Sequence, residues 1–115
     1  MPGAKIGERV CVICGKAEDG VIDVFGYGVR IEDAIPEPGV LFMGIDMHEL
    51  GCPSPTLRLD NGDTVYGCEC WWGSEKRIQK SLEGQTTREI TVASYREKAR
   101  KQMEAEKAEA KADGG

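Results

Sequence analysis

The stretch TVYGCECWWGSEKRIQK, residues 64–80, places two cysteines, Cys68 and Cys70, between a strand-like run and a helix-like run. In a fully extended strand their Cα atoms would lie about 6.6 Å apart, whereas two sulfurs on one zinc ion approach to roughly 3.8 Å. We therefore expect the chain to curl at Cys68, between a hairpin that ends at Gly67 and a helix that begins after Gly73. Such a curl favours a site in which both cysteines bind one metal ion.

A second cysteine pair, Cys11 and Cys14, lies in the run ERVCVICGK, residues 8–16. A Cys-x-x-Cys followed by glycine is typical of a zinc knuckle, in which a β-rich run enters a tight turn. Because tetrahedral structural zinc takes four thiolates, the two pairs together predict a Cys₄ site that holds Zn²⁺. The predicted ligands are Cys11, Cys14, Cys68 and Cys70.

Cys52 is an alternate ligand, because the hairpin predicted below carries it toward Cys70. Two ligand sets therefore stay open. The first consists of the four thiolates named above, and the second includes Cys52. His48, the single histidine of the chain, lies beside Glu49 in a predicted loop, where we expect it to be exposed. A thioredoxin-like redox pair is disfavoured, because the glycine-rich residues 15–20 form a poor helix. Rubredoxin-like iron is disfavoured by the Cys-x-Cys spacing.

The length and composition limit the fold and the compartment. A chain of 115 residues allows one domain with a modest core, and 15 glycines with 30% charged residues indicate a body rich in loops and turns. Residues 1–8 contain no apolar run typical of a signal peptide, and no later run reaches membrane-spanning length. We therefore predict a cytoplasmic protein without membrane contact. In that reducing compartment, closely spaced cysteines are expected to bind metal rather than to form disulfides.

Three apolar runs predict strands in the first half of the chain. The run VIDVF, residues 21–25, and the run VRI, residues 29–31, flank Gly26-Tyr27-Gly28, which predicts a hairpin with a three-residue loop. The most apolar run, VLFMGIDM at residues 40–47, is short and contains β-branched and aromatic residues. It predicts a central strand.

A second hairpin is predicted from TLRLD, residues 56–60, and DTVYG, residues 63–67, which are joined by Asn61-Gly62. Asn-Gly after an aspartate is the strongest short-range hairpin signal. If Asp60 pairs with Asp63, then Leu57 lies opposite Tyr66.

Two helices are predicted in the second half. Ser74 caps a helix over residues 75–83, which Gly84 ends, and residues 88–92 form a last strand. A capping box at Ser94 begins a charged helix that leaves the body. The chain is thus an α+β protein, a small single domain of β-hairpins around a Cys₄ zinc site, with a short helix after the site and a protruding charged C-terminal helix. The predicted division is residues 1–93 for the zinc-stapled domain and residues 94–115 for the tail.

The order of these pieces resembles the treble-clef and zinc-ribbon families. The resemblance rests on the knuckle CVICGK at residues 11–16, a hairpin, the second pair CEC at residues 68–70 and a helix. It implies that the second cysteine pair lies at the start of the helix over residues 75–83. Small, acidic, zinc-stapled proteins with a charged helical tail also look like accessory proteins of bacteria and their phages.

The leading functional prediction is a zinc-stabilised binding or regulatory module that contacts a protein partner without catalysis. A closed Cys₄ zinc has no open coordination position, and the sequence supplies no set of acid, base and nucleophile, so we predict that the chain is not an enzyme. Trp71 and Trp72 are the candidate contact residues, because tryptophan is enriched at binding hot spots.

Two alternatives depend on charge. Residues 18–63 hold ten acids against Arg30 and Arg58, and the formal net charge of the chain is −5, which disfavours contact with phosphate backbones. One alternative is an inhibitor in which this acidic segment imitates nucleic acid. The other is nucleic-acid binding, with a tryptophan stacked on a base. Its contact residues would be Lys76, Arg77 and Lys80.

Overall fold

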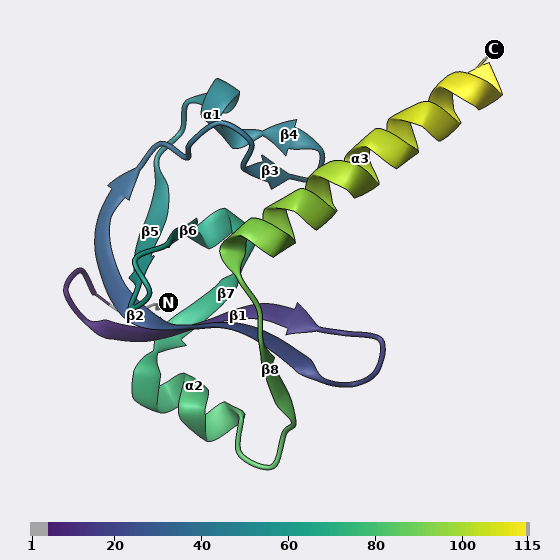
Figure 1. Cartoon of the computed structure of the whole chain (residues 1–115). Helices are drawn as coiled ribbons and strands as arrows, with labels where there is room; N and C mark the ends of the chain where they lie inside the picture. Colours follow the sequence, from purple (N-terminus) through teal and green to yellow (C-terminus); the bar gives the residue numbers. More distant parts are fainter. Residues whose placement is uncertain (1–4, 115) are drawn as a thin grey trace.

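The computed structural model describes residues 5–114, with side chains over residues 5–108. Six strands form one sheet in the order β6-β5-β2-β1-β7, with β8 beside β2 (Figure 1). The strands of this sheet are β1 (Arg9–Lys16), β2 (Ile22–Ala34), β5 (Ser54–Leu59), β6 (Thr64–Tyr66), β7 (Trp71–Ser74) and β8 (Thr87–Glu89). The sheet is antiparallel apart from the β2–β8 pair. With its helices it confirms the mixed α+β class.

The remaining elements are a two-stranded sheet and four helical segments. The small sheet consists of β3 (Leu41–Phe42) and β4 (Ile45–Asp46). The helical segments are α1 (Met47–Leu50), the 3₁₀ helix η1 (Gly67–Glu69), α2 (Glu75–Ser81) and α3 (Val92–Gly114). Helix α3 extends away from the sheet, as predicted for the charged C-terminal segment (Figure 1). No helix in residues 5–114 is long and apolar enough to cross a membrane.

Strand β2 is the central strand of the sheet and pairs with three others, β1, β5 and β8. Its first residues pair with β8 on one side, its later residues pair with β5, and β1 lies along the other side. The hairpin loop predicted at Gly26-Tyr27-Gly28 is wrong, because the strand runs through these residues. Gly28 serves close packing instead, since a Cβ atom there would collide with the carbonyl oxygen of Arg58 on β5.

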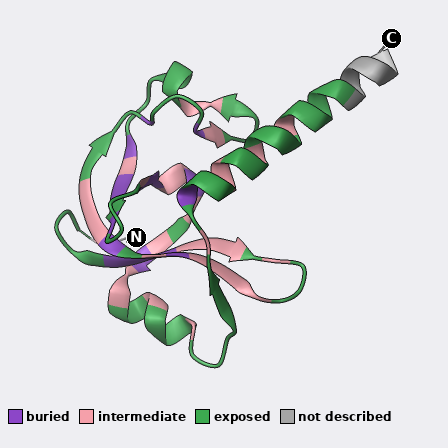
Figure 2. Ribbon diagram, in the orientation of Figure 1, coloured by how far each residue is buried: buried purple, intermediate pink, exposed green. Residues whose placement is uncertain are grey.

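The core lies on one face of this sheet and beneath the start of α3 (Figure 2). Alternate residues of a strand point to opposite faces, so Val10 and Val12 of β1 enter the core while Cys11 does not. The cluster of buried side chains is Val10, Val12, Phe25, Leu57, Leu59, Val65 and Val92. The ring of Tyr95 packs edge-on against Phe25, with 5.5 Å between centroids, and attaches α3 to the core.

The hairpin predicted at Asn61-Gly62 is confirmed as β5–β6, but its register differs by one residue. Leu57 pairs with Val65, where we had expected Tyr66. The loop takes Asp60 as well as Asn61 and Gly62, and the Leu59 amide donates to the Asp63 carbonyl at 2.8 Å. Gly62 has φ +95°, as the left-handed position of a three-residue hairpin requires.

The central strand predicted over residues 40–47 is wrong. The chain reverses at Met43 and Gly44, which have φ values of 52° and 80°, and forms the β3–β4 hairpin outside the main sheet. Positive φ at both central positions defines a tight hairpin turn, and Gly44 adopts this conformation at no steric cost. A local turn signal therefore outweighed the hydrophobicity of the run.

The helix boundaries also differ from prediction. α2 follows Ser74, but the Ser74 side chain makes no capping hydrogen bond among the described residues. α3 begins at Val92, two residues before the predicted Ser94. Thr91 provides the start signal, because its hydroxyl oxygen accepts the Ser94 amide at 3.1 Å, while the Ser94 hydroxyl donates to the Thr91 carbonyl. The predicted domain boundary at residues 93/94 thus falls inside α3.

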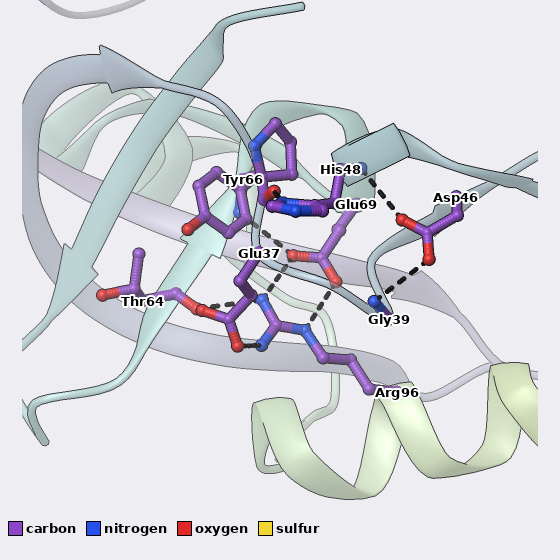
Figure 3. A network of polar contacts seen from close by, with 9 residues as sticks. Glu37, Gly39, Asp46, His48, Thr64, Tyr66, Glu69 and Arg96 are labelled. Carbon is purple, nitrogen blue, oxygen red and sulfur yellow. Dashed lines mark hydrogen bonds and ion pairs between the residues drawn. The ribbon is translucent and has the colours of Figure 1, made fainter. Parts of the chain in front are cut away.

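A buried ion pair anchors α3 to η1 (Figure 3). The guanidinium of Arg96 donates to both carboxylate oxygens of Glu69, at 2.9 and 2.8 Å, and to the Thr64 carbonyl at 3.1 Å. The same carboxylate accepts the Tyr66 amide at 3.1 Å. The Glu69 side chain is 1% exposed and that of Arg96 is 20% exposed. Desolvation of this pair is offset by the hydrogen bonds that surround it.

The network continues into the segment that carries the β3–β4 hairpin (Figure 3). Arg96 also donates to Glu37 at 2.9 Å. Asp46 accepts the Gly39 and His48 amides, and the His48 ring bonds to the Pro36 carbonyl at 2.9 Å. The segment before β3 is therefore held against α3.

Candidate functional site

The structure places Cys11 apart from the other predicted zinc ligands. It lies in the middle of β1, opposite Gly73 of β7 and Tyr27 of β2. A Cβ atom on Gly73 would meet Ile78 of α2, so this face of the sheet, and with it Cys11, is covered by α2. Burial raises the pKa of the Cys11 thiol above its usual range.

Cys14, Cys68 and Cys70 lie on the core side. Cys14 follows Val12 by two residues in β1, so strand alternation places it on that side, where it packs against the core cluster together with Cys70. The Cys70 thiol donates to the Tyr66 carbonyl at 3.3 Å. Burial holds the pKa of Cys70 far above its usual range, and the charge of Glu69 adds to the effect. Such a thiol is a weak nucleophile.

The curl expected at Cys68 is present as η1, but the tight turn expected at Gly15 is wrong, because β1 continues to Lys16. Cys52 is exposed in the loop before β5, and its thiol lies 3.9 Å from the Leu50 carbonyl oxygen. Within residues 5–108, where side chains are described, no three His, Cys, Asp or Glu side chains are grouped so that they could hold a metal ion. Zinc binding therefore stays a prediction from the cysteine spacing.

The two candidate contact tryptophans have different surroundings. Trp71 is 78% exposed and pairs with Ile13, on the face of the sheet that α2 partly covers. Trp72 is half-buried, packs against the core, and stacks under the Arg30 guanidinium at 5.2 Å from its ring centroid. Trp71 is thus available to a partner, whereas Trp72 contributes mainly to the fold.

Trp71 borders a groove of about 480 Å³ between β7 and α2. Its apolar floor comes from Ile13 of β1 and Ile78 of α2, and its lining is Ile13, Trp71, Trp72, Gly73, Arg77, Ile78 and Ser81. Gly73 lets α2 approach, because a Cβ atom there would come within 3.2 Å of Ile78 Cδ1. The groove lies along β7, which ends the sheet on this side.

Positive charge gathers on the helix beside this groove. The acid of its first turn, Glu75, is paired with Arg9 at 3.2 Å. The three predicted nucleic-acid contacts make no ion pair within the part of the chain that the structure describes. They are Lys76, Arg77 and Lys80. Of these three, Arg77 is in the groove lining, so the groove combines an apolar floor with one cation, and Lys76 and Lys80 lie elsewhere on the same helix.

Some members of this site escaped prediction from the sequence. Ile13 lies inside the Cys-x-x-Cys motif, so the sequence presented it as part of a knuckle. Its signal was strand alternation, which sets Cys11 and Ile13 on the face opposite Val10 and Val12. Ile78 lies in the helix predicted over residues 75–83, but its contact with Gly73 depends on how the sheet folds.

The chain was compared with protein-family models, with curated proteins and with solved structures, and none of the three comparisons found a match.

Proposed function

We propose that this chain is a non-catalytic binding module that holds an extended, acidic segment of a protein partner in the groove between β7 and α2. The observation that carries the proposal is the exposure of Trp71, a large aromatic side chain, beside that groove. Exposed tryptophan at a concave apolar surface is typical of binding hot spots.

The backbone of β7 offers the second part of the recognition. β7 pairs with β1 on one side and ends the sheet on the other, so it presents an edge in the described part of the chain. An extended peptide can add a strand at such an edge, in which main-chain hydrogen bonds give affinity and side-chain pockets give specificity. Alternate apolar side chains of the partner would contact Trp71, Ile13 and Ile78.

The charges define the partner further. Arg77 lines the groove and has no ion-pair partner among the described residues, so acidic side chains of the incoming segment would be attracted. A basic segment would be repelled by Lys76, Arg77 and Lys80. Zinc, if the cysteines bind it, would stabilise the body of the module and would not contact the partner.

Single-stranded nucleic acid is the second candidate, and the same exposed Trp71 beside Arg77 favours it, because bases stack on aromatic rings flanked by cations. The formal net charge of −5 opposes it. The acidic-mimic alternative is weakened where acids are paired within the chain, since Arg88 binds Asp19 at 3.2 Å and Asp23 at 2.7 Å.

The test uses ¹⁵N-labelled protein and synthetic peptides of about eight residues, the length of a long added strand. One peptide alternates glutamate with leucine, the second alternates lysine with leucine, and oligothymidylate is the third probe. We expect shifts of the β7 and α2 amides with the acidic peptide only. Trp71→Ala and Arg77→Glu should each weaken binding about tenfold or more. Phe42→Ala, another exposed aromatic, is the matched control and should bind as the parent does.

Three outcomes would overturn the proposal. An acidic peptide that leaves the β7 amides unshifted would remove the site, and equal binding of the lysine peptide would remove the charge argument. Salt-sensitive binding of oligothymidylate, lost in Trp71→Ala, would replace the protein partner by nucleic acid.

A further inference from the structure

A second exposed apolar surface lies on the β3–β4 hairpin, away from the residues that line the β7 groove. Met43 at the tip of the hairpin is 85% exposed, and Phe42, Ile45 and Leu50 are exposed nearby. Met43 is also the one non-glycine residue with positive φ in the described chain. A methionine held in this conformation at an exposed turn is unusual, because positive φ is disfavoured for residues with a Cβ atom.

This surface continues onto α3. A shallow groove of about 250 Å³ separates the hairpin from the helix. Met43 contributes from the hairpin, and Ala99 and Met103 contribute from the helix, where both are half-buried. The full lining is Leu41, Met43, Gly44, Tyr95, Ala99, Gln102, Met103 and Glu106.

The charges of α3 are divided along its length. Residues 97–101 carry three cations and one acid, whereas residues 104–113 carry four acids and two lysines. Arg96 does not add to the exposed basic part, because it is bound to Glu69 and Glu37. The helix thus carries net positive charge before Met103 and net negative charge after it, and two of its exposed pairs, Arg100 with Glu104 and Lys101 with Glu97, lie within the chain.

We infer that two copies of this chain associate through α3, antiparallel, about a twofold axis near Met103. An isologous interface requires a surface that is complementary to itself, and a strip that is positive at one end and negative at the other meets this condition when it is paired antiparallel. The apolar side chains at the centre, Met43 and Met103 of both copies, would then be buried. The far part of α3, which extends beyond the body of its own chain, would lie against the body of the partner copy.

The anchoring of the hairpin supports this geometry. Arg96 bonds to Glu37 before the hairpin, and Asp46 and His48 fix its other end (Figure 3). Hairpin and helix therefore present one preformed surface, and association does not require either element to be ordered first. A parallel pairing would place like charges together and is disfavoured.

The first experiment is sedimentation equilibrium over a concentration series. We expect a monomer–dimer equilibrium that weakens with added salt. Met103→Glu and, separately, Lys101→Glu should each raise the dissociation constant about tenfold or more. Lys101 is exposed on the helix, so its variant folds even if Met103→Glu is unstable. Trp71→Ala is the matched control and should dimerise as the parent does, which separates this inference from the proposed function.

The second experiment tests the antiparallel arrangement. Chains labelled with ¹⁴N and ¹⁵N are mixed and treated with a zero-length carbodiimide cross-linker, which joins lysines to acids. We expect mixed-isotope links from Lys98 or Lys101 to Glu104 or Glu106. A monomer at every concentration, or links that join only chains of the same isotope, would overturn the inference.

Discussion

Replacement of Arg96 by alanine tests the most buried ion pair among the described residues. The side chain gives two hydrogen bonds to Glu69, one to Glu37 and one to the Thr64 carbonyl. Its loss leaves the Glu69 carboxylate, which is 1% exposed, with the Tyr66 amide as its one remaining partner of those described. A buried charge without its counter-ion is strongly destabilising.

The magnitude follows from this burial. Removal of one partner from a fully buried pair costs about 3–5 kcal/mol. Arg96 is 20% exposed, so water enters part of the site after the substitution, and we take the lower end, about 3 kcal/mol. For a chain of this length, 1 kcal/mol corresponds to roughly 4 °C in Tm. Arg96→Ala should therefore lower Tm by roughly 12 °C.

Urea denaturation and differential scanning calorimetry measure the change. Arg100→Ala is the control, because Arg100 forms an exposed pair with Glu104 one helical turn away. It should cost about 0.5 kcal/mol or less. In a Glu69→Gln background no charge is left buried, so Arg96→Ala should cost clearly less there than in the parent. An Arg96→Ala variant within about 1 kcal/mol of the parent would refute the reasoning, as would equal costs in the two backgrounds.

Two further predictions concern packing and metal. Gly28→Ala should destabilise the fold by about 3 kcal/mol in urea denaturation. The added Cβ atom would collide with the Arg58 backbone, which is fixed in β5. A loss of stability below about 1 kcal/mol would contradict the close approach of the two strands. The cysteine spacing predicts about one zinc per chain, measured by mass spectrometry on protein purified without added metal, lost in Cys70→Ser and kept in Cys52→Ser. If Cys11→Ser keeps its zinc, Cys11 is excluded as a ligand, in agreement with its position under α2. A parent protein purified without any metal would contradict the prediction of zinc binding.

The features that the sequence predicted correctly depend on neighbouring residues. The β5–β6 hairpin, the curl at Cys68 and the helix after Ser74 each follow from a few adjacent residues. The register of the hairpin was missed by one residue because Asp60 joins the loop, and the sequence allows two loop lengths.

The features that were missed depend on distant contacts. Gly26 and Gly28 have the composition of a turn, yet they lie within β2 because β1 and β5 pack closely on either side. The partnership of Glu69 with Arg96 joins residues far apart in the chain, and neither lies in a pattern that marks a buried ion pair. The exposed face of β7 became visible only when the sheet order placed this strand at an edge.

The two proposed surfaces are built on different elements of the fold, so one small chain can present both. The groove at Trp71 is built on β7 and α2, whereas the surface at Met43 is built on the β3–β4 hairpin and α3. The two use different elements, and the Arg96 network belongs to the second alone. Because residues that share no contacts contribute nearly independently, a change at Met103 should leave the β7 groove intact. A dimer formed through α3 would then carry two copies of that groove, and a partner with two acidic segments would bind with an avidity that a monomer cannot supply.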